Sequence, residues 1–348
     1  MQTLFDDTEL EFRATVSRLS DSVRIANPGD LDVADRDEVW KRLAGAGLLE
    51  LRVRDGDRPI GSGIEVMIAC EALGAALVPA PYIGSAVMAI ELLERAHADA
   101  GLVAEVAAGS RRFGILLRPD MADLATWRAG EPAIVFDGDG AEEALALSDE
   151  SEPRVVRVPI SGAPSKGIDL TRSIATIELP AAGTEVIGEP LTRAALDRWR
   201  ALALVALTAD QVGLMRAVLG LAVEYSKERE AFGTHIGTFQ ALQHMCAEAH
   251  VEIEAAFTLV KYAAYAVDGR DVADALDAAR VAKGHASSSI RPVVESCIQV
   301  FGGIGHTWDH IAHFYLRRGL LDRELLGSER DQFTVLGADA VARRRAER

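Results

Sequence analysis

The C-terminal half of the chain is dominated by three long segments of helical periodicity, and these most limit what the sequence can fold into. They cover about residues 192–230, 239–267 and 272–301. Apolar residues recur in them at three- and four-residue spacing, the pattern of helices that bury one face. Helices this long are unusual in globular proteins unless they form the spine of a bundle. We therefore expect a C-terminal four-helix-bundle domain over residues 191–348.

The N-terminal third of the chain carries shorter helical patterns. Glycine and proline interrupt them, notably at Gly47 and in the run Val78-Pro79-Ala80-Pro81. An N-terminal helical domain over residues 1–110 is the simplest interpretation. Its expected helices start after Asp7 and cover about residues 36–46, 64–77, 84–95 and 101–108.

The region between these two parts, residues 111–190, has a different sequence pattern. Short runs that favour strands alternate here with turn residues. We expect a small β domain, so that the whole chain is α+β and mostly α. The expected strands cover residues 113–117, 133–136, 155–158, 173–179 and 185–187.

Composition and charge exclude several classes of partner. With 37 basic and 53 acidic side chains among 348 residues, the chain has a net charge of −16. Such a chain repels nucleic-acid backbones and anionic lipid surfaces, so no nucleic acid and no membrane is expected as a partner. No uninterrupted apolar run reaches the roughly 18 residues of a membrane span. The N-terminal segment Met1–Asp7 is acidic where a signal peptide is basic, which favours a cytoplasmic protein.

Metal-binding patterns are weak in this sequence. Its cysteines, Cys70, Cys246 and Cys297, are far apart in apolar stretches and are expected to be buried core thiols. His310 and His313 could face one side of a helix together, but no clustered Cys or Glu completes a ligand set. No metal is expected.

Two segments at helix ends combine glycine turns with a fixed polar side chain. The first is Arg229-Glu-Ala-Phe-Gly-Thr-His-Ile-Gly-Thr-Phe-Gln240, and the second is Gln299-Val-Phe-Gly-Gly-Ile-Gly-His-Thr307. Glycines let a ligand approach the backbone N–H groups closely, and an arginine suits an anionic pyrophosphate. Each segment by itself also fits an ordinary helix C-cap.

Together the two segments resemble the acyl-CoA dehydrogenase family. That family carries R-x-x-F-G-x-x-I-x-x-F-Q in its C-terminal domain, followed some sixty residues later by Q-x-x-G-G-x-G. The resemblance extends to Leu43-Ala-Gly-Ala-Gly-Leu-Leu49, to Glu71-Ala-Leu-Gly74 and to the order of helices, strands and helices. It covers nearly the whole chain and implies the acyl-CoA dehydrogenase-like fold.

The resemblance implies a cofactor, flavin adenine dinucleotide (FAD), shared at a subunit interface. In the family, the Arg, Phe and Gln residues of these motifs bind the adenosine diphosphate part of the flavin held by the neighbouring subunit. The implied flavin contacts of this chain are Arg229, Phe232, Phe239, Gln240, Gln299, Gly302 and Gly303.

The sequence departs from the family pattern where the flavin ring and the base are concerned. The family's T-E-x-x-x-G-S-D-like and W-I-T/S-like stretches, which hold the ring, are absent from the β region. The position of the family's catalytic Glu falls on Leu326, and that of the alternative Glu falls on Ala203. Neither side chain accepts a proton. Asp210, further along the same predicted helix as Ala203, is the one acid we nominate as a base.

The chain thus keeps the motifs that cross an interface and lacks those that act within a subunit. It resembles the shortened subunit of actinobacterial heterotetramers that act in steroid side-chain breakdown. We expect a subunit that pairs with a full-length acyl-CoA dehydrogenase and takes part in oxidising an acyl-CoA to 2,3-enoyl-CoA. Two alternatives remain open: a self-sufficient homo-oligomeric dehydrogenase, and a flavin-free structural or regulatory scaffold.

Overall fold

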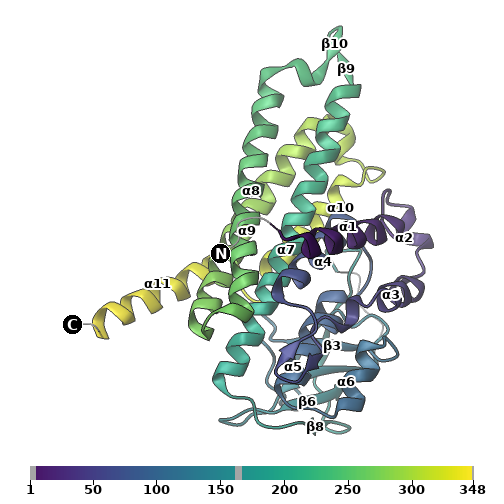
Figure 1. The fold of residues 1–348 in the computed structure, drawn as a ribbon. Coiled ribbons are helices and arrows are strands. Elements are labelled where there is room, and N and C mark those ends of the chain that lie inside the picture. Colours follow the sequence, from purple (N-terminus) through teal and green to yellow (C-terminus); the bar gives the residue numbers. More distant parts are fainter. Residues whose placement is uncertain (1–4, 161–166, 347–348) are drawn as a thin grey trace.

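A computed structural model describes residues 5–160 and 167–346 (Figure 1). Residues 1–4, part of the acidic N-terminal segment, lie outside the described residues. The long helices α7, α8 and α9 run side by side as a column, and the shorter helices and the sheet gather around its lower half. The expected α+β, mostly helical fold is confirmed. The division into three domains at about residues 110 and 190 stays a prediction.

The N-terminal helices begin at residues that cap them. Asp6 and Ser62 each form a capping box with the glutamate three residues later, which satisfies free N–H groups of the first turn. The region predicted as one helix over 84–95 is instead a π-helix, Tyr82–Ala89, that continues into α5. The helices are α1 (Asp7–Ser22), α2 (Asp30–Val33), α3 (Arg36–Gly45), α4 (Gly63–Ala75), α5 (Ile90–Arg95) and α6 (Ala100–Ala107).

A six-stranded sheet of order β7-β4-β3-β5-β6-β8 follows, in which only β3 and β5 pair in parallel. Along its strands, side chains alternate between the main core, shared with the helices, and a smaller cluster on the opposite face. The strands are β3 (Phe113–Leu117), β4 (Pro132–Phe136), β5 (Glu143–Leu147), β6 (Val155–Pro159), β7 (Ile174–Glu178) and β8 (Glu185–Ile187).

The sequence did not predict β5. Its residues, Glu-Ala-Leu-Ala-Leu, have high helix propensity and lack β-branched side chains. Tertiary pairing overrides this propensity, because β5 fills the gap between β3 and β6 and hydrogen-bonds to both. The other five strands lie where the sequence predicts them.

The C-terminal part consists of α7 (Arg193–Glu228), α8 (Gln240–Gly269), α9 (Val272–Phe301), α10 (Ala312–Glu324) and α11 (Glu329–Ala346). Within the described residues, α7 is the one helix with the length and hydropathy of a membrane span, and 83% of that apolar window is buried inside the protein. Its apolar character is therefore explained by its place at the centre of the bundle, against α4, α8 and α9.

Two short hairpins extend from these layers. β1 (Arg54–Asp55) and β2 (Arg58–Pro59) form the first, between α3 and α4. β9 (Glu230–Ala231) and β10 (Thr234–His235) form the second, at the far end of the bundle between α7 and α8 (Figure 1).

Candidate functional site

The first glycine-turn segment forms the distal tip of the bundle. Arg229 ends α7, and its carbonyl accepts a hydrogen bond from Ile236 N–H at 2.9 Å, which closes the β9–β10 hairpin. The turn between the strands consists of Phe232 and Gly233, with φ of 56° and 81°. The left-handed region costs a phenylalanine about 1–2 kcal/mol, yet the ring of Phe232 is 98% exposed.

The other residues of this segment surround the turn. The rings of Phe232 and Phe239 meet edge to face, with centroids 6.2 Å apart. Phe239 precedes α8 and Gln240 begins it, and both side chains are exposed. The tip therefore presents two aromatic rings and two polar side chains to its surroundings.

The second glycine-turn segment lies at the same end of the bundle. The rings of Tyr225, near the end of α7, and Phe301, at the end of α9, are in contact at 5.4 Å. Gln299 is exposed on the last turn of α9, and a short 3₁₀ helix, Gly302–His306, follows. Gly302 has φ 66° and ψ −143°, and no atom lies within 4 Å of where its Cβ or that of Gly303 would stand. A ligand can therefore approach this backbone closely.

The polar side chains among the predicted flavin contacts have no partners in the described chain. Within residues 5–160 and 167–346, the side chains of Arg229, Gln240 and Gln299 form no hydrogen bond or ion pair. An unpaired guanidinium binds anions well, and exposed aromatic rings can cover a flat ring system. These residues fit the diphosphate and adenine parts of a dinucleotide presented from outside the chain.

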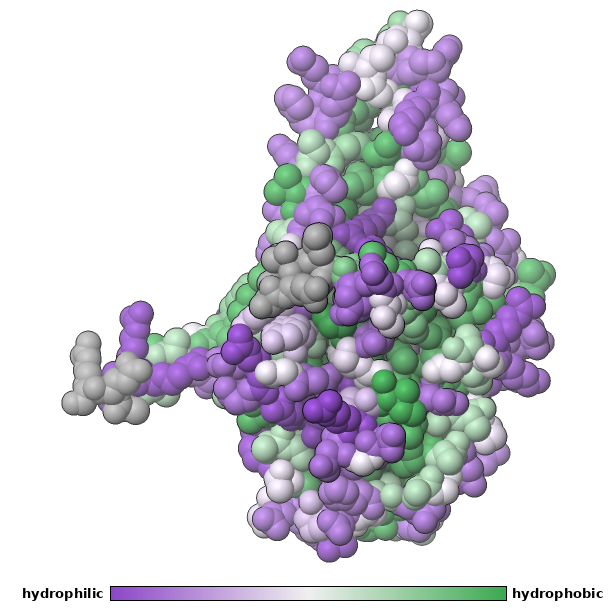
Figure 2. Space-filling model, in the orientation of Figure 1, coloured by the Kyte–Doolittle hydropathy of each residue, from purple (hydrophilic) through white to green (hydrophobic). Residues whose placement is uncertain are grey.

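Apolar side chains are also exposed along the upper half of the bundle. Figure 2 shows hydrophobic surface between the hydrophilic side chains of this region. Leu221 and Val251 are among the exposed apolar residues of α7 and α8. Scattered apolar residues are normal on a protein surface.

The two family base positions are buried inside the chain. Leu326 is 1% exposed, has φ 57°, and donates its N–H to the carbonyl oxygen of Met121 at 2.8 Å. Ala203 is buried in the middle of α7. Neither position provides a group that could accept a proton.

Asp210, nominated as a base, is held between two arginines. Its carboxylate accepts hydrogen bonds from Arg318 at 2.6 and 2.9 Å and lies 2.9 Å from Arg172. Burial alone would raise the pKa of Asp210, but the charges of Arg172 and Arg318 outweigh it and lower this pKa to about 2. The adjoining cavity of about 10 Å³ has room for at most one water molecule. This geometry fits a structural carboxylate and opposes a catalytic base.

Further contacts close the junction between the sheet and the helices. Arg172, just before β7, also pairs with Asp322 of α10 at 2.8 Å. In the loop after β3, Ala122 and Asp123 bind Arg200 of α7, through a carbonyl and an ion pair. Polar side chains of this chain therefore occupy the junction between the sheet and the helices.

Sequence reasoning missed this buried polar cluster because its members come from distant segments. Arg172, Asp210 and Arg318 have no motif in common and are far apart in the chain. One signal was available, namely that Asp210 interrupts an otherwise apolar stretch of helix. Charged residues in such places are almost never fully buried unless they are paired.

The histidines near the second segment have local partners. His310 packs on Phe301 with ring centroids 4.3 Å apart, and its Nδ1 accepts the N–H of Ala312. His313 Nε2 lies 3.2 Å from the carbonyl of Trp308. Over the described part of the chain, no group of three or more His, Cys, Asp or Glu side chains could hold a metal ion.

Comparison with known sequences identifies relatives of this chain. Residues 192–340 match the family model described as acyl-CoA dehydrogenase, C-terminal domain. The acyl-CoA dehydrogenase IpdE2 of Mycobacterium tuberculosis is 33% identical over 272 residues, which is 78% of this chain and 76% of the relative. The acyl-CoA dehydrogenase FadE34 of the same organism is 32% identical over 80% of this chain and 39% of its own length.

Comparison with solved structures extends the similarity to the whole chain. A structure described as the Tcur3481–Tcur3483 steroid ACAD G363A variant is 25% identical, with a TM-score of 0.78 and coverage of 98% of this chain and 99% of that one. The ChsE4–ChsE5 complex from Mycobacterium tuberculosis has a TM-score of 0.80 at 22% identity, over 98% and 99% of the two chains. At that level of identity the second likeness supports the fold alone.

Proposed function

The chain belongs to the acyl-CoA dehydrogenase family, and from that premise we propose that it is the half-site subunit of a flavin-dependent heteromer. The proposed complex oxidises an acyl-CoA to the 2,3-enoyl-CoA. This chain contributes contacts to the diphosphate and adenine of an FAD held by a full-length partner, and the partner supplies the base. The observation that carries the proposal is the outward, unpaired set of Arg229, Gln240 and Gln299 at the tip.

Each tip residue has a task in this proposal. Arg229 neutralises diphosphate charge, for which the planar guanidinium is suited because it forms paired, charge-assisted hydrogen bonds. Phe232 and Phe239 cover apolar surface, while Gln299 donates to or accepts from polar edges. Gly302 and Gly303 leave the backbone accessible. When bound, the flavin supplies the acceptor for the hydride that leaves Cβ of the thioester.

The same proposal assigns the α-proton to the partner subunit. Removing it requires a positioned base within hydrogen-bond reach of the substrate. Leu326 and Ala203 cannot serve, and Asp210 is saturated by arginines.

The names of relatives favour the substrate class and the assembly. One solved structure is described as a steroid ACAD and another as a complex of ChsE4 with ChsE5. We therefore propose a steroid-derived acyl-CoA as the substrate and a heterotetramer, in the cytoplasm, as the working form.

Flavin content per polypeptide tests the proposal. We expect little or no flavin on the chain expressed alone, and one flavin per pair of chains after co-expression with a full-length family member, measured by visible absorbance after denaturation. About one flavin per chain for the protein alone would overturn the proposal in favour of a self-sufficient homo-oligomer.

A charge-removal variant separates the proposal from the scaffold alternative. Arg229→Ala in the reconstituted complex should lose flavin, whereas Arg193→Ala, an exposed arginine at the opposite end of α7, should retain it. If both variants keep full flavin content, the tip residues do not bind flavin and the scaffold alternative is favoured.

A further inference from the structure

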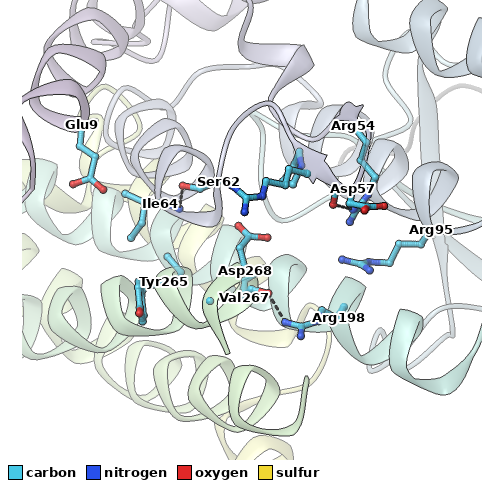
Figure 3. Close-up of a pocket in the computed structure, with 14 residues that line it drawn as sticks. Glu9, Arg54, Asp57, Ser62, Ile64, Arg95, Arg198, Tyr265, Val267 and Asp268 are labelled. Atoms are coloured by element: carbon cyan, nitrogen blue, oxygen red, sulfur yellow. Dashed lines mark hydrogen bonds between the residues drawn. The ribbon is translucent and has the colours of Figure 1, made fainter. Parts of the chain in front are cut away.

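A second cavity, remote from the bundle tip, lies where the N-terminal helices meet the bundle. Its volume is about 610 Å³, within the range of about 300–1,000 Å³ typical of ligand pockets. The walls come from the β1–β2 hairpin, the end of α5, and the facing parts of α7 and α8 (Figure 3). Its lining includes four arginines and a tyrosine: Arg54, Arg58, Arg95, Arg198 and Tyr265.

The cavity concentrates positive charge in a chain whose net charge is −16. Arg54, Arg58 and Arg198 have no carboxylate within ion-pair distance in the described residues. Arg54 donates to the backbone carbonyl of Asp57 at 2.8 Å, and Arg198 donates to two carbonyls at the end of α8. The exposed guanidinium of Arg58 has no partner among the described residues.

Two of the nearby acids are already engaged by other arginines. Glu91 lies 2.6 Å from Arg95 and accepts a hydrogen bond from the buried Arg52 at 2.9 Å. Asp268 pairs with Arg52 at 3.3 Å and accepts the N–H of Gly63 at 2.7 Å. Two further acids line the cavity: Glu9 accepts the N–H of Asp6, and the carboxylate of Asp57 has no partner among the described residues. The four lining arginines therefore face three lining acids, one of which already pairs with Arg52.

Arg95 carries an unused donor at the cavity wall. Its side chain is 15% exposed, and its Nε atom is buried without a hydrogen-bond partner in the part of the chain described. Burial lowers the pKa of Arg95 despite the opposing charge of Glu91, and the charges of Arg54 and Arg52 lower it further. An anion in the cavity would relieve the repulsion among the guanidinium groups.

The opposite end of the cavity carries an apolar and an aromatic side chain beside Glu9 and Ser62. Figure 3 shows Ile64 and Tyr265 on one side, Arg54 and Arg95 on the other, and Asp268 and Arg198 between them. The ring of Tyr265 lies against Gly269, at 3.4 Å from where a Cβ would stand, and the side chain is 40% exposed. A ligand with a charged group at one end and a flat ring at the other matches these two ends.

We propose that this cavity binds a nucleoside monophosphate. Arg54, Arg58 and Arg95 contact the phosphate, and Tyr265 stacks on the base. The site is built from this chain alone and does not depend on the proposed flavin contacts, which lie at the distal tip.

Calorimetric titration of the full chain at low ionic strength tests the site with three probes: inorganic phosphate, adenosine 5′-monophosphate and uncharged adenosine. We expect both anions to bind, and the nucleotide to bind at least about tenfold more tightly because it adds base stacking. Arg58→Gln should weaken binding of both anions about tenfold or more, since it removes a charge-assisted contact. Tyr265→Ala should weaken binding of the nucleotide but not of phosphate.

Two matched variants serve as controls. Arg330→Gln removes an exposed arginine on α11, and Tyr262→Ala removes a half-exposed tyrosine one turn earlier on α8 than Tyr265. Neither should change binding. If neither anion binds at millimolar concentration, or if Arg58→Gln binds as the wild type does, the anion site is overturned. Equal affinity for phosphate and nucleotide would overturn the nucleoside part of the proposal.

Discussion

The distal tip of the bundle and the junction between the sheet and the helices differ in the burial and the pairing of their polar side chains. At the tip, Arg229 and Gln299 are exposed and have no partner in the described chain. At the junction, Arg172, Asp210 and Arg318 are buried and bind one another. Polar side chains are thus available at the tip and already engaged at the junction.

This difference suits the tip to binding a ligand and the junction to stabilising the fold. Charges left without partners at a surface can bind a ligand from another molecule at little cost to the fold. Charges saturated in the interior hold layers together, and breaking one pair leaves the other charge buried and uncompensated. Substitutions at the junction should therefore lower the stability of the fold more than substitutions at the tip.

The largest effect should come from Asp210→Ala. It leaves Arg172 and Arg318 buried without their shared carboxylate, so we expect the free energy of unfolding to fall by about 3–5 kcal/mol. Denaturant unfolding measures the change. Asp197→Ala breaks an exposed pair with Arg193 on the same helix and should cost about 0–1 kcal/mol. Similar losses in both variants would mean that the junction is not the special region described here.

The next effect concerns pH at the same junction. Burial raises the pKa of Asp137 to about 6, despite the nearby positive charge of Arg172 and the N–H of Gly84. Because the folded pKa is raised above the ordinary value of 3.8, the neutral form suits the fold. The stabilising contribution of Asp137 to the free energy of unfolding is present below about pH 4 and is lost as the pH rises through about 6.

Asp137→Asn isolates that contribution. The asparagine keeps an acceptor for Gly84 N–H and tolerates the left-handed backbone, φ 53°, at this position. We expect the variant to gain stability relative to the wild type between pH 4 and 6, by up to about 3 kcal/mol for a shift of about two pH units. A difference that stays constant over this range would show that Asp137 does not titrate as described.

A third prediction concerns Arg229→Ala in the reconstituted complex. Losing charge-assisted hydrogen bonds of about 1.5–3 kcal/mol should weaken flavin binding at least about tenfold, measured by fluorescence on dilution. The unfolding of the isolated chain should not change, because Arg229 has no side-chain partner in the described residues. A clear loss of stability in the isolated chain would contradict the contrast between the two regions.

The smallest effect should come from Phe232→Gly, and it should have opposite signs in two assays. Glycine removes the left-handed strain of a phenylalanine, so the isolated chain should become more stable by about 1 kcal/mol. The complex should bind flavin less tightly, because an aromatic contact is lost. Phe314→Leu, which alters a ring buried in the bundle, should instead destabilise the isolated chain. Stabilisation of both chain and complex by Phe232→Gly would exclude an interface role for Phe232.

Much of the fold could be predicted because local patterns and tertiary contacts agree. The helix over 272–301 and the strand over 113–117 have the predicted bounds. The strand β5 could not be predicted, since its alanine and leucine residues favour a helix until β3 and β6 pair with it. The π-helical Tyr82–Ala89 was also missed, because all of its residues are buried and no alternation of apolar and polar residues reveals the type of helix.

The candidate sites also differ in how far the sequence could predict them. The tip residues lie in two continuous motifs, so the sequence could point to them, although their contact with flavin stays a prediction. The arginine-lined cavity collects Arg54, Arg95 and Arg198 from separate elements, and the overall acidity of the chain gives no sign of it. The nomination of Asp210 as a base, which stays a prediction, did not anticipate the contact with Arg172 from the β region.

The succession of helical, strand-rich and helical segments, the family, and the turns at the ends of α7 and α9 could be read from the sequence, because these depend on short-range periodicity and on glycine. The pairing of charges depends on the tertiary structure. Asp210 and Arg318 come together through the packing of α10 on α7, while the side chain of Arg229 has no partner among the described residues where α7 ends in the hairpin. Charge pairing depends on distance in space and on burial, and the spacing of residues along the chain gives neither quantity.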